Sequence, residues 1–130
     1  MTDSKLDTSS EGFAAIARDA VRSLGGVDLP IWLYIEAGDG WVEPSLYQIR
    51  PDAVEWTDPD MAFVDIIENA WYALDTGQRW AVMEMDIADG RFTSHMRFPG
   101  EVPTDGAGSM DRREAALAAR FGDKPVIYPD

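Results

Sequence analysis

Three ionisable side chains on one predicted β-hairpin could carry acid–base or metal chemistry. Glu84 and Asp86 are two residues apart, so on a strand they share a face, and His95 lies opposite on the next strand. Carboxylates and imidazole serve as general acids or bases and as metal ligands. The chain has a single His and no Cys, however, and a Glu–His contact across two strands is an ordinary surface feature. We therefore predict no catalytic residue and no metal ion here.

The sequence offers little else for catalysis. Asp58-Pro59-Asp60 resembles the start of a calcium-binding loop, but Ala62 and Phe63 stand where further ligands and the turn glycine are required. The chain contains no Gly-rich phosphate loop, no nucleophile elbow and no His-Glu-x-x-His helix. We predict a protein that is not an enzyme and that binds no cofactor.

The net charge favours some partners over others. Lys and Arg number 11 against 24 Asp and Glu, which gives a formal net charge of −13. This charge repels nucleic acid and anionic membranes, so we expect neither as a partner. Residues 110–130 carry four basic and four acidic side chains, so the excess lies in the first 109 residues, where a basic protein would meet it. Alternatively, the charge serves only solubility.

The chain has the length and apolar content of a single domain. It has 130 residues, of which 45% are hydrophobic, so we predict one domain over residues 1–130, with 1–8 and 125–130 loosely ordered. The absence of Cys fits a reducing compartment. The N-terminal residues lack an apolar segment, and the longest apolar run, Pro30–Ile35, is too short to span a bilayer. We expect a cytoplasmic protein.

Three helices are predicted from caps and apolar periodicity. The first begins at the capping-box pair Thr8 and Glu11 and stops at Gly25-Gly26. The second has Asp58 as its N-cap and Pro59 at its first position, and ends at Gly77. The third, over about Met110–Phe121, has a less sharply defined apolar face.

Two hairpins lie between the helices. Arg79–Ile87 and Arg91–Phe98 flank Asp89-Gly90, a preferred hairpin turn, and the register places Glu84 opposite His95 and Asp86 opposite Thr93. A similar hairpin surrounds Asp39-Gly40, with Pro44 marking an edge strand or a bulge. These elements predict a two-layer α+β domain in which an antiparallel sheet of two or more hairpins packs against helices.

The face of the sheet that points away from these helices is the predicted binding surface. If the hairpins share one sheet, this outer face collects aromatic and ionisable side chains: Trp32, Tyr34, Glu36, Glu43, Tyr47, Glu84, Asp86 and His95. Interface centres favour Trp and Tyr, and carboxylates steer a cationic partner. Alternatively, the first helix or the C-terminal segment covers these aromatics. Glu36 opposite Glu43 places like charges across a strand pair, which indicates a compensating cation inside or outside the chain.

The segment from Trp71 to Phe121 resembles the YezG-like immunity proteins, which neutralise polymorphic or LXG-type bacterial toxins. The similarity consists of a helix, a strand led by Trp80, the turn Asp89-Gly90-Arg91-Phe92, the strand end Met96-Arg97-Phe98-Pro99 and the helix start Asp111-Arg112-Arg113-Glu114. The strand Trp32–Glu36 is also similar to the family's aromatic strand. Phe121 stands where a Trp-Glu pair would end the last helix, and the N-terminal half is shorter.

This resemblance implies an antitoxin that binds a cognate toxin, which the charge predicts to be basic. From the residues of the outer face we expect Trp32 and Tyr34 to anchor this contact and the carboxylates around them to orient it. A different class of function stays open, namely a small-ligand or regulatory domain with aromatic residues lining a pocket between sheet and helices. The oligomeric state, monomer or homodimer, is also left open.

Overall fold

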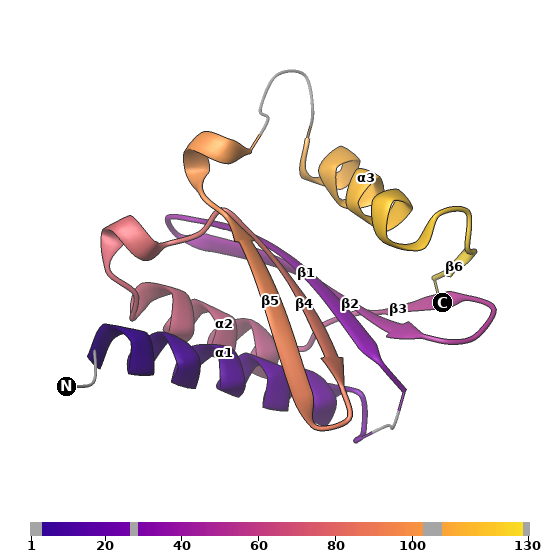
Figure 1. Ribbon diagram of the computed structural model, residues 1–130, viewed down its shortest axis with the longest axis horizontal. Coiled ribbons are helices and arrows are strands. Elements are labelled where there is room, and N and C mark those ends of the chain that lie inside the picture. Colours follow the sequence, from indigo (N-terminus) through magenta and orange to yellow (C-terminus); the bar gives the residue numbers. More distant parts are fainter. Residues whose placement is uncertain (1–3, 27–28, 103–107, 129–130) are drawn as a thin grey trace.

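The protein forms one six-stranded sheet with three helices. The structure, a computed structural model, describes residues 4–26, 29–102 and 108–128. The elements in chain order are α1 (Ser4–Ser23), β1 (Ile31–Gly38), β2 (Trp41–Ile49), β3 (Val54–Thr57), α2 (Met61–Tyr72), the 3-10 turn η1 (Thr76–Gln78), β4 (Val82–Ala88), β5 (Arg91–Arg97), the 3-10 turn η2 (Pro99–Glu101), α3 (Ser109–Phe121) and β6 (Val126–Ile127). The sheet order is β5-β4-β1-β2-β3-β6 (Figure 1).

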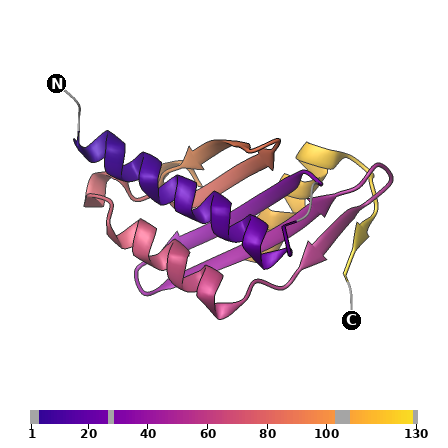
Figure 2. The same cartoon turned by 90° about the horizontal axis from the view of Figure 1, so that it is seen from below.

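The sheet carries helices on both faces. Helices α1 and α2 lie side by side across one face, and α3 lies across the other, as Figures 1 and 2 show. The main core fills the space between α1, α2 and the inner face of the sheet, with Ile16, Leu33, Phe63, Ile67 and Met85 fully buried. The predicted α+β class, with an antiparallel sheet packed against helices, is confirmed. No helix of the described residues is long and apolar enough to cross a membrane.

The two predicted hairpins are present in the predicted register. Glu84 pairs with His95 and Asp86 with Thr93 across β4 and β5, and positive φ angles at Asp89 (54°) and Gly90 (71°) form the tight turn. The hairpins join edge to edge, because β1 also pairs antiparallel with β4. Their polar and aromatic residues therefore do lie on one shared outer face.

The neighbours of Pro44 explain how β2 accommodates a proline. Pro44 pairs with Ile35 of β1, whereas β3 pairs only with Leu46 to Ile49 of β2. The far side of β2 is therefore an open edge at Pro44, where a missing backbone N–H costs no ladder bond.

The predicted helix boundaries need correction at three ends. Helix α1 begins at Ser4, before the predicted cap Thr8, although Gly25 and Gly26 follow its end with positive φ as expected. The N-cap of α2 is Asp60 rather than Asp58, since its side chain accepts the Phe63 N–H at 2.8 Å. This helix ends at Tyr72, not at Gly77.

Two small strands were missed by the sequence analysis. β3 pairs with β2, and β6 pairs in parallel with β3 at the sheet edge. Both are short, which leaves little periodicity to detect. The segments expected to be loosely ordered, 1–8 and 125–130, fall partly on residues 1–3 and 129–130, which lie outside the described residues.

Candidate functional site

The aromatic residues of the outer face are buried beneath α3. Trp32 and Tyr47 are 0% exposed and Tyr34 is 3% exposed. The ring of Phe121, at the end of α3, meets Trp32 edge-on at 5.4 Å, and Leu117 is buried in the same cluster. The expectation that these aromatics face water is therefore wrong, and the C-terminal segment covers them instead. A partner can reach Trp32, Tyr34 or Tyr47 only if α3 leaves the sheet.

Glu36 is also buried, and its charge is met by an arginine of α3. Arg112 binds the carboxylate through two donors, with Nη2 at 2.8 Å from Oε1 and Nε at 2.9 Å from Oε2. The hydroxyl of Tyr34 donates to the same Oε2 at 2.7 Å. Glu36 does pair with Glu43 across the strands, so the predicted compensating cation exists inside the chain. The hydrogen bonds to Glu36 raise the pKa of Arg112 above its usual value.

Glu84, Asp86 and His95 do not form a joint site. Asp86 pairs with Arg120 of α3, and Glu84 pairs with Arg97 of β5 at 3.3 Å. His95 is exposed on the edge strand opposite Glu84. Within the described residues, no group of three His, Cys, Asp or Glu side chains is placed to hold a metal ion. The carboxylates here act as ion-pair acceptors for neighbouring arginines.

Burial shifts the titration of the covered tyrosines. Loss of water around the ring raises the pKa of Tyr47 to about 12. Burial, together with the hydrogen bond to Glu36, raises the pKa of Tyr34 as well. Both hydroxyls therefore stay protonated through the physiological range, and neither is poised as a general base.

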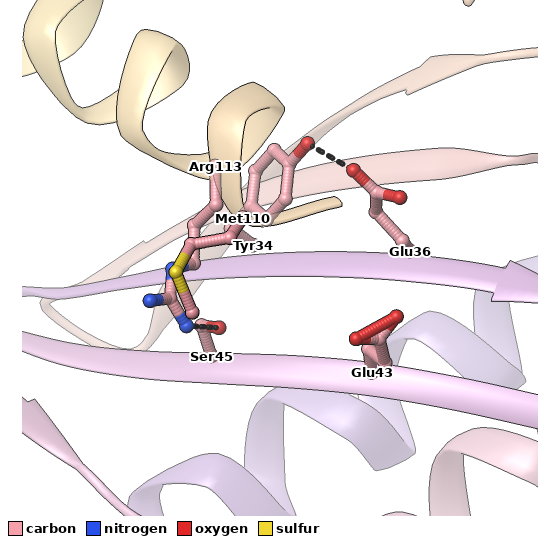
Figure 3. A pocket seen from close by; sticks show the side chains of 6 residues that line it. All are labelled: Tyr34, Glu36, Glu43, Ser45, Met110 and Arg113. Atoms are coloured by element: carbon pink, nitrogen blue, oxygen red, sulfur yellow. Dashed lines mark hydrogen bonds between the residues drawn. The ribbon is translucent and has the colours of Figure 1, made fainter. Parts of the chain in front are cut away.

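A small hollow remains where α3 begins. Tyr34, Glu36, Glu43, Ser45, Met110 and Arg113 line a space of about 70 Å³ (Figure 3). Arg113 donates to the Ser45 hydroxyl at 3.2 Å on its far side. Drug-sized and metabolite ligands occupy pockets of roughly 300–1,000 Å³. This hollow therefore has room for a few water molecules or for the tip of one side chain from a partner.

The end of the β1–β2 hairpin, next to this hollow, gathers exposed apolar and acidic side chains. Asp39, Trp41 and Glu43 are exposed on the hairpin itself, Tyr72 of α2 reaches its turn, and Met110 of α3 lies across the hollow from Glu43. Trp41 is 44% exposed, Tyr72 43% and Met110 61%. The backbone N–H of Gly40 donates to the Tyr72 hydroxyl at 2.5 Å, which holds the hairpin against the end of α2.

Of these residues, only Glu43 was predicted from the sequence as a binding residue. Trp41 follows from the predicted register, since it lies two residues before Glu43 on the same face of the strand. The sequence around Tyr72 does not predict its place beside the hairpin, because its contact with Gly40 joins segments that are 32 residues apart.

No protein-family model matches the chain, and no curated protein matches it in sequence.

Proposed function

We propose that this chain is an acidic binding protein that neutralises a basic protein, most simply a bacterial toxin, by covering its working surface. The observation that carries this proposal is the distribution of charge in the fold. Arg112 and Arg120 of α3 are bound to sheet carboxylates of the same chain, so two of its cations are already paired within the fold, Arg112 in a mostly buried pair and Arg120 in an exposed one. The excess negative charge is then carried by acidic side chains at the protein surface.

One segment shows this excess most clearly. Residues 51–78, which contain β3 and α2, have seven acidic residues and no Lys or Arg. Asp58, Asp65 and Asp75 among them are exposed. Such a surface speeds the encounter with a cationic protein and repels nucleic acid.

The sequence resemblance supports the same function. The segments that resemble YezG-like immunity proteins correspond to the end of α2, to β4, the β4–β5 turn, β5 and the start of α3. Neutralisation by occlusion needs a complementary surface and no catalytic group. Binding alone therefore suffices for the proposed activity.

The test combines capture with neutralisation. Tagged protein is used to capture partners from its native host, and each captured protein is then expressed with and without this chain. We expect a basic protein whose toxicity disappears on co-expression, with association near ~10⁸ M⁻¹s⁻¹ at low salt that slows as salt is added. A captured partner that is acidic, or one whose toxicity persists, would contradict the proposal.

A second candidate function, binding of a small anionic ligand, is favoured by one specific observation. A hollow of about 330 Å³ between α1 and the β4–β5 hairpin has a mostly apolar lining with Arg18 and Arg91 beside it. Neither arginine has an ion-pair partner among the described residues. The hollow is large enough for a small carboxylate with an apolar body.

Thermal shift separates the two functions. A ligand for the hollow stabilises the protein by RT ln(1 + [L]/Kd), so a carboxylate such as octanoate should raise the Tm, and Arg18→Ala should abolish that rise. If octanoate and octanol, which lacks the charge, give the same shift, the two arginines have no role as a ligand site.

A further inference from the structure

We infer that the open edge of β5 binds the carboxyl-terminal segment of another polypeptide as an added antiparallel strand, with the terminal carboxylate held by Arg18 and Arg91. This inference goes beyond the proposed function, and it gives the hollow beside these arginines a peptide rather than a free small molecule as its ligand. Three observations support it, namely the unpaired backbone of β5, the incomplete core beneath this strand and the position of the two arginines.

The backbone of β5 has free hydrogen-bonding groups along one edge. β5 is the terminal strand of the sheet, and β4 is its neighbour on the other side. The two-residue turn makes Ala88 and Arg91 a hydrogen-bonded pair, so every second residue from Arg91 onward bonds to β4. The Ala81 N–H, which donates to the Arg97 carbonyl at 2.8 Å, agrees with this alternation. The remaining residues of β5 point their backbone N–H and C=O groups to the open edge: Phe92, Ser94 and Met96.

The core beneath the sheet is incomplete at β5. On β4 the inward side chains of Met83, Met85 and Ile87 are buried, whereas Phe92 and Met96 of β5 are only half-buried, although they pack against the same cluster. Alternate side chains of an added strand fall on the same face of the sheet. Such a strand would therefore cover the apolar surface that β5 leaves exposed, while its backbone completes the hydrogen bonds of the edge.

The hollow of about 330 Å³ lies where β5 begins. Figure 1 shows the start of β5 next to the second half of α1, and the hollow between them is also lined by Ile87 and Phe92. Among the described residues, its lining contains Arg18 and Arg91 and no acidic side chain, since Asp89 of the turn lines a neighbouring hollow. An apolar space with two arginines in its wall suits an apolar side chain that adjoins a carboxylate.

The position of the arginines sets the direction of the bound strand. From β5 to β3, all neighbouring strands of the sheet pair antiparallel. A strand that pairs antiparallel with β5 ends where β5 begins, and Arg91 and Arg18 both lie there. Both side chains are exposed, and neither has an ion-pair partner among the described residues, so a main-chain carboxylate gains two charged donors without breaking an internal pair.

The first experiment compares two forms of one peptide. The probe is acetyl-Val-Thr-Val-Thr-Val with a free carboxyl terminus, whose Val side chains would all face α1, and the control is the same peptide with a terminal amide. In NMR titrations at about 0.15 M salt we expect the amide to bind at least about 10-fold more weakly, because it loses the charge-assisted bonds. Absence of saturable binding of the free acid at about 1 mM, or equal affinity of the two forms, would overturn the inference.

Backbone pairing is tested separately from charge. N-methylation of the central Val removes an N–H that faces β5 and should weaken binding at least about 5-fold, whereas N-methylation of the following Thr removes one that faces solvent and should change it less than about 2-fold. Bound peptide should slow amide exchange at Ser94 and Met96 but not at Thr93 and His95, which already bond to β4. Equal effects of the two N-methylations would contradict strand addition.

Variants of the protein locate the site. Arg18→Ala and Arg91→Ala should each weaken binding of the free acid at least about 5-fold and leave binding of the amide unchanged. Arg50→Ala removes an arginine between β2 and β3 and should change binding less than about 2-fold. Ser94→Pro removes an N–H that β4 does not use, so we expect the variant to fold and to lose the peptide. Equal affinities of Arg18→Ala and Arg50→Ala, or wild-type affinity of Ser94→Pro, would contradict the site.

The outcome is separable from the functions proposed above. If octanoate raises the Tm through Arg18 but the peptide does not bind, the hollow takes small carboxylates and strand addition is wrong. If the peptide binds at the β5 edge but no basic protein is neutralised, the peptide site stands and the proposed function fails.

Discussion

Arg112 of α3 binds Glu36 of β1 through two hydrogen bonds, across 76 residues of sequence, and so joins the C-terminal helix to the sheet. The pair also resolves the repulsion between Glu36 and Glu43, which face each other across β1 and β2. Glu36 is only 3% exposed, so its carboxylate depends on this partner and on the Tyr34 hydroxyl. The negative charge of Glu36 on the outer face is thus balanced by a cation of the same chain.

Removal of Arg112 should destabilise the fold. Arg112→Ala leaves the buried Glu36 carboxylate without its cation, and we expect a loss of about 3 kcal/mol in the free energy of unfolding, measured by urea denaturation. Arg91→Ala makes the same charge change at an exposed position and should cost less than about 0.5 kcal/mol. The double variant Glu36→Gln, Arg112→Ala should recover part of the loss. Equal effects of Arg112→Ala and Arg91→Ala would show that the Arg112–Glu36 pair contributes nothing to the free energy of unfolding.

Leu117 should control whether α3 stays on the sheet. It is the buried side chain of α3 among the described residues, and a carboxylate there would have no partner. We expect Leu117→Asp to destabilise the attachment of α3 by at least about 3 kcal/mol, so that the amides of α3 exchange faster while those of β1 stay protected. Ala118→Asp, on the exposed side of the same helix, should leave exchange unchanged. Loss of protection in β1 at the same time would show that α3 does not detach separately.

Alkaline pH should weaken the fold through Tyr47. Its pKa in the folded state, about 12, lies above the ordinary value of about 10, so the folded state holds the proton more tightly. This contribution is complete below pH 10 and is lost as the pH rises from 10 to 12, at about 1.4 kcal/mol per pH unit. Tyr47→Phe should reduce the slope of unfolding free energy against pH by that amount. The same slope in Tyr47→Phe and in wild type would show that the Tyr47 hydroxyl does not contribute.

The N-cap of α2 can be checked by comparing two aspartates. Asp60 caps the helix at Phe63 and pairs with Arg22, whereas Asp58 lies outside the helix. Asp60→Ala should therefore lower the Tm more than Asp58→Ala. The Phe63 N–H and then Arg22 lower the pKa of Asp60, so this stabilisation is present above the ordinary pKa of about 4 and fades as the pH falls through the lower folded value. Equal Tm values for both variants at neutral pH would place the cap elsewhere.

The sequence by itself determined the hairpins, their register and the α+β class. Asp39-Gly40 and Asp89-Gly90 are turn signals read from two residues, and the alternation around them fixes which side chains share a face. Helices α1 and α2 were predicted because their apolar residues repeat at helical spacing. These signals depend only on residues that are close in the sequence, so they can be recognised without knowledge of the fold. The error at Asp58 arose because a second cap candidate, Asp60, lies two residues further on, whereas the helix ends at Tyr72, before the glycine used as its stop signal.

Only the tertiary structure decided which surface is open. α3 has a short apolar face, and its place on the sheet depends on contacts with residues far away in the sequence, namely Arg112 with Glu36 and Phe121 with Trp32. The same packing buried the aromatics predicted to bind a partner and left Trp41 and Tyr72 exposed. Periodicity shows that a side chain points away from the core between the sheet and helices α1 and α2. It does not show which element covers the opposite face of the sheet. Such a choice follows from long-range packing and charge pairing, for which a single sequence carries no local signal.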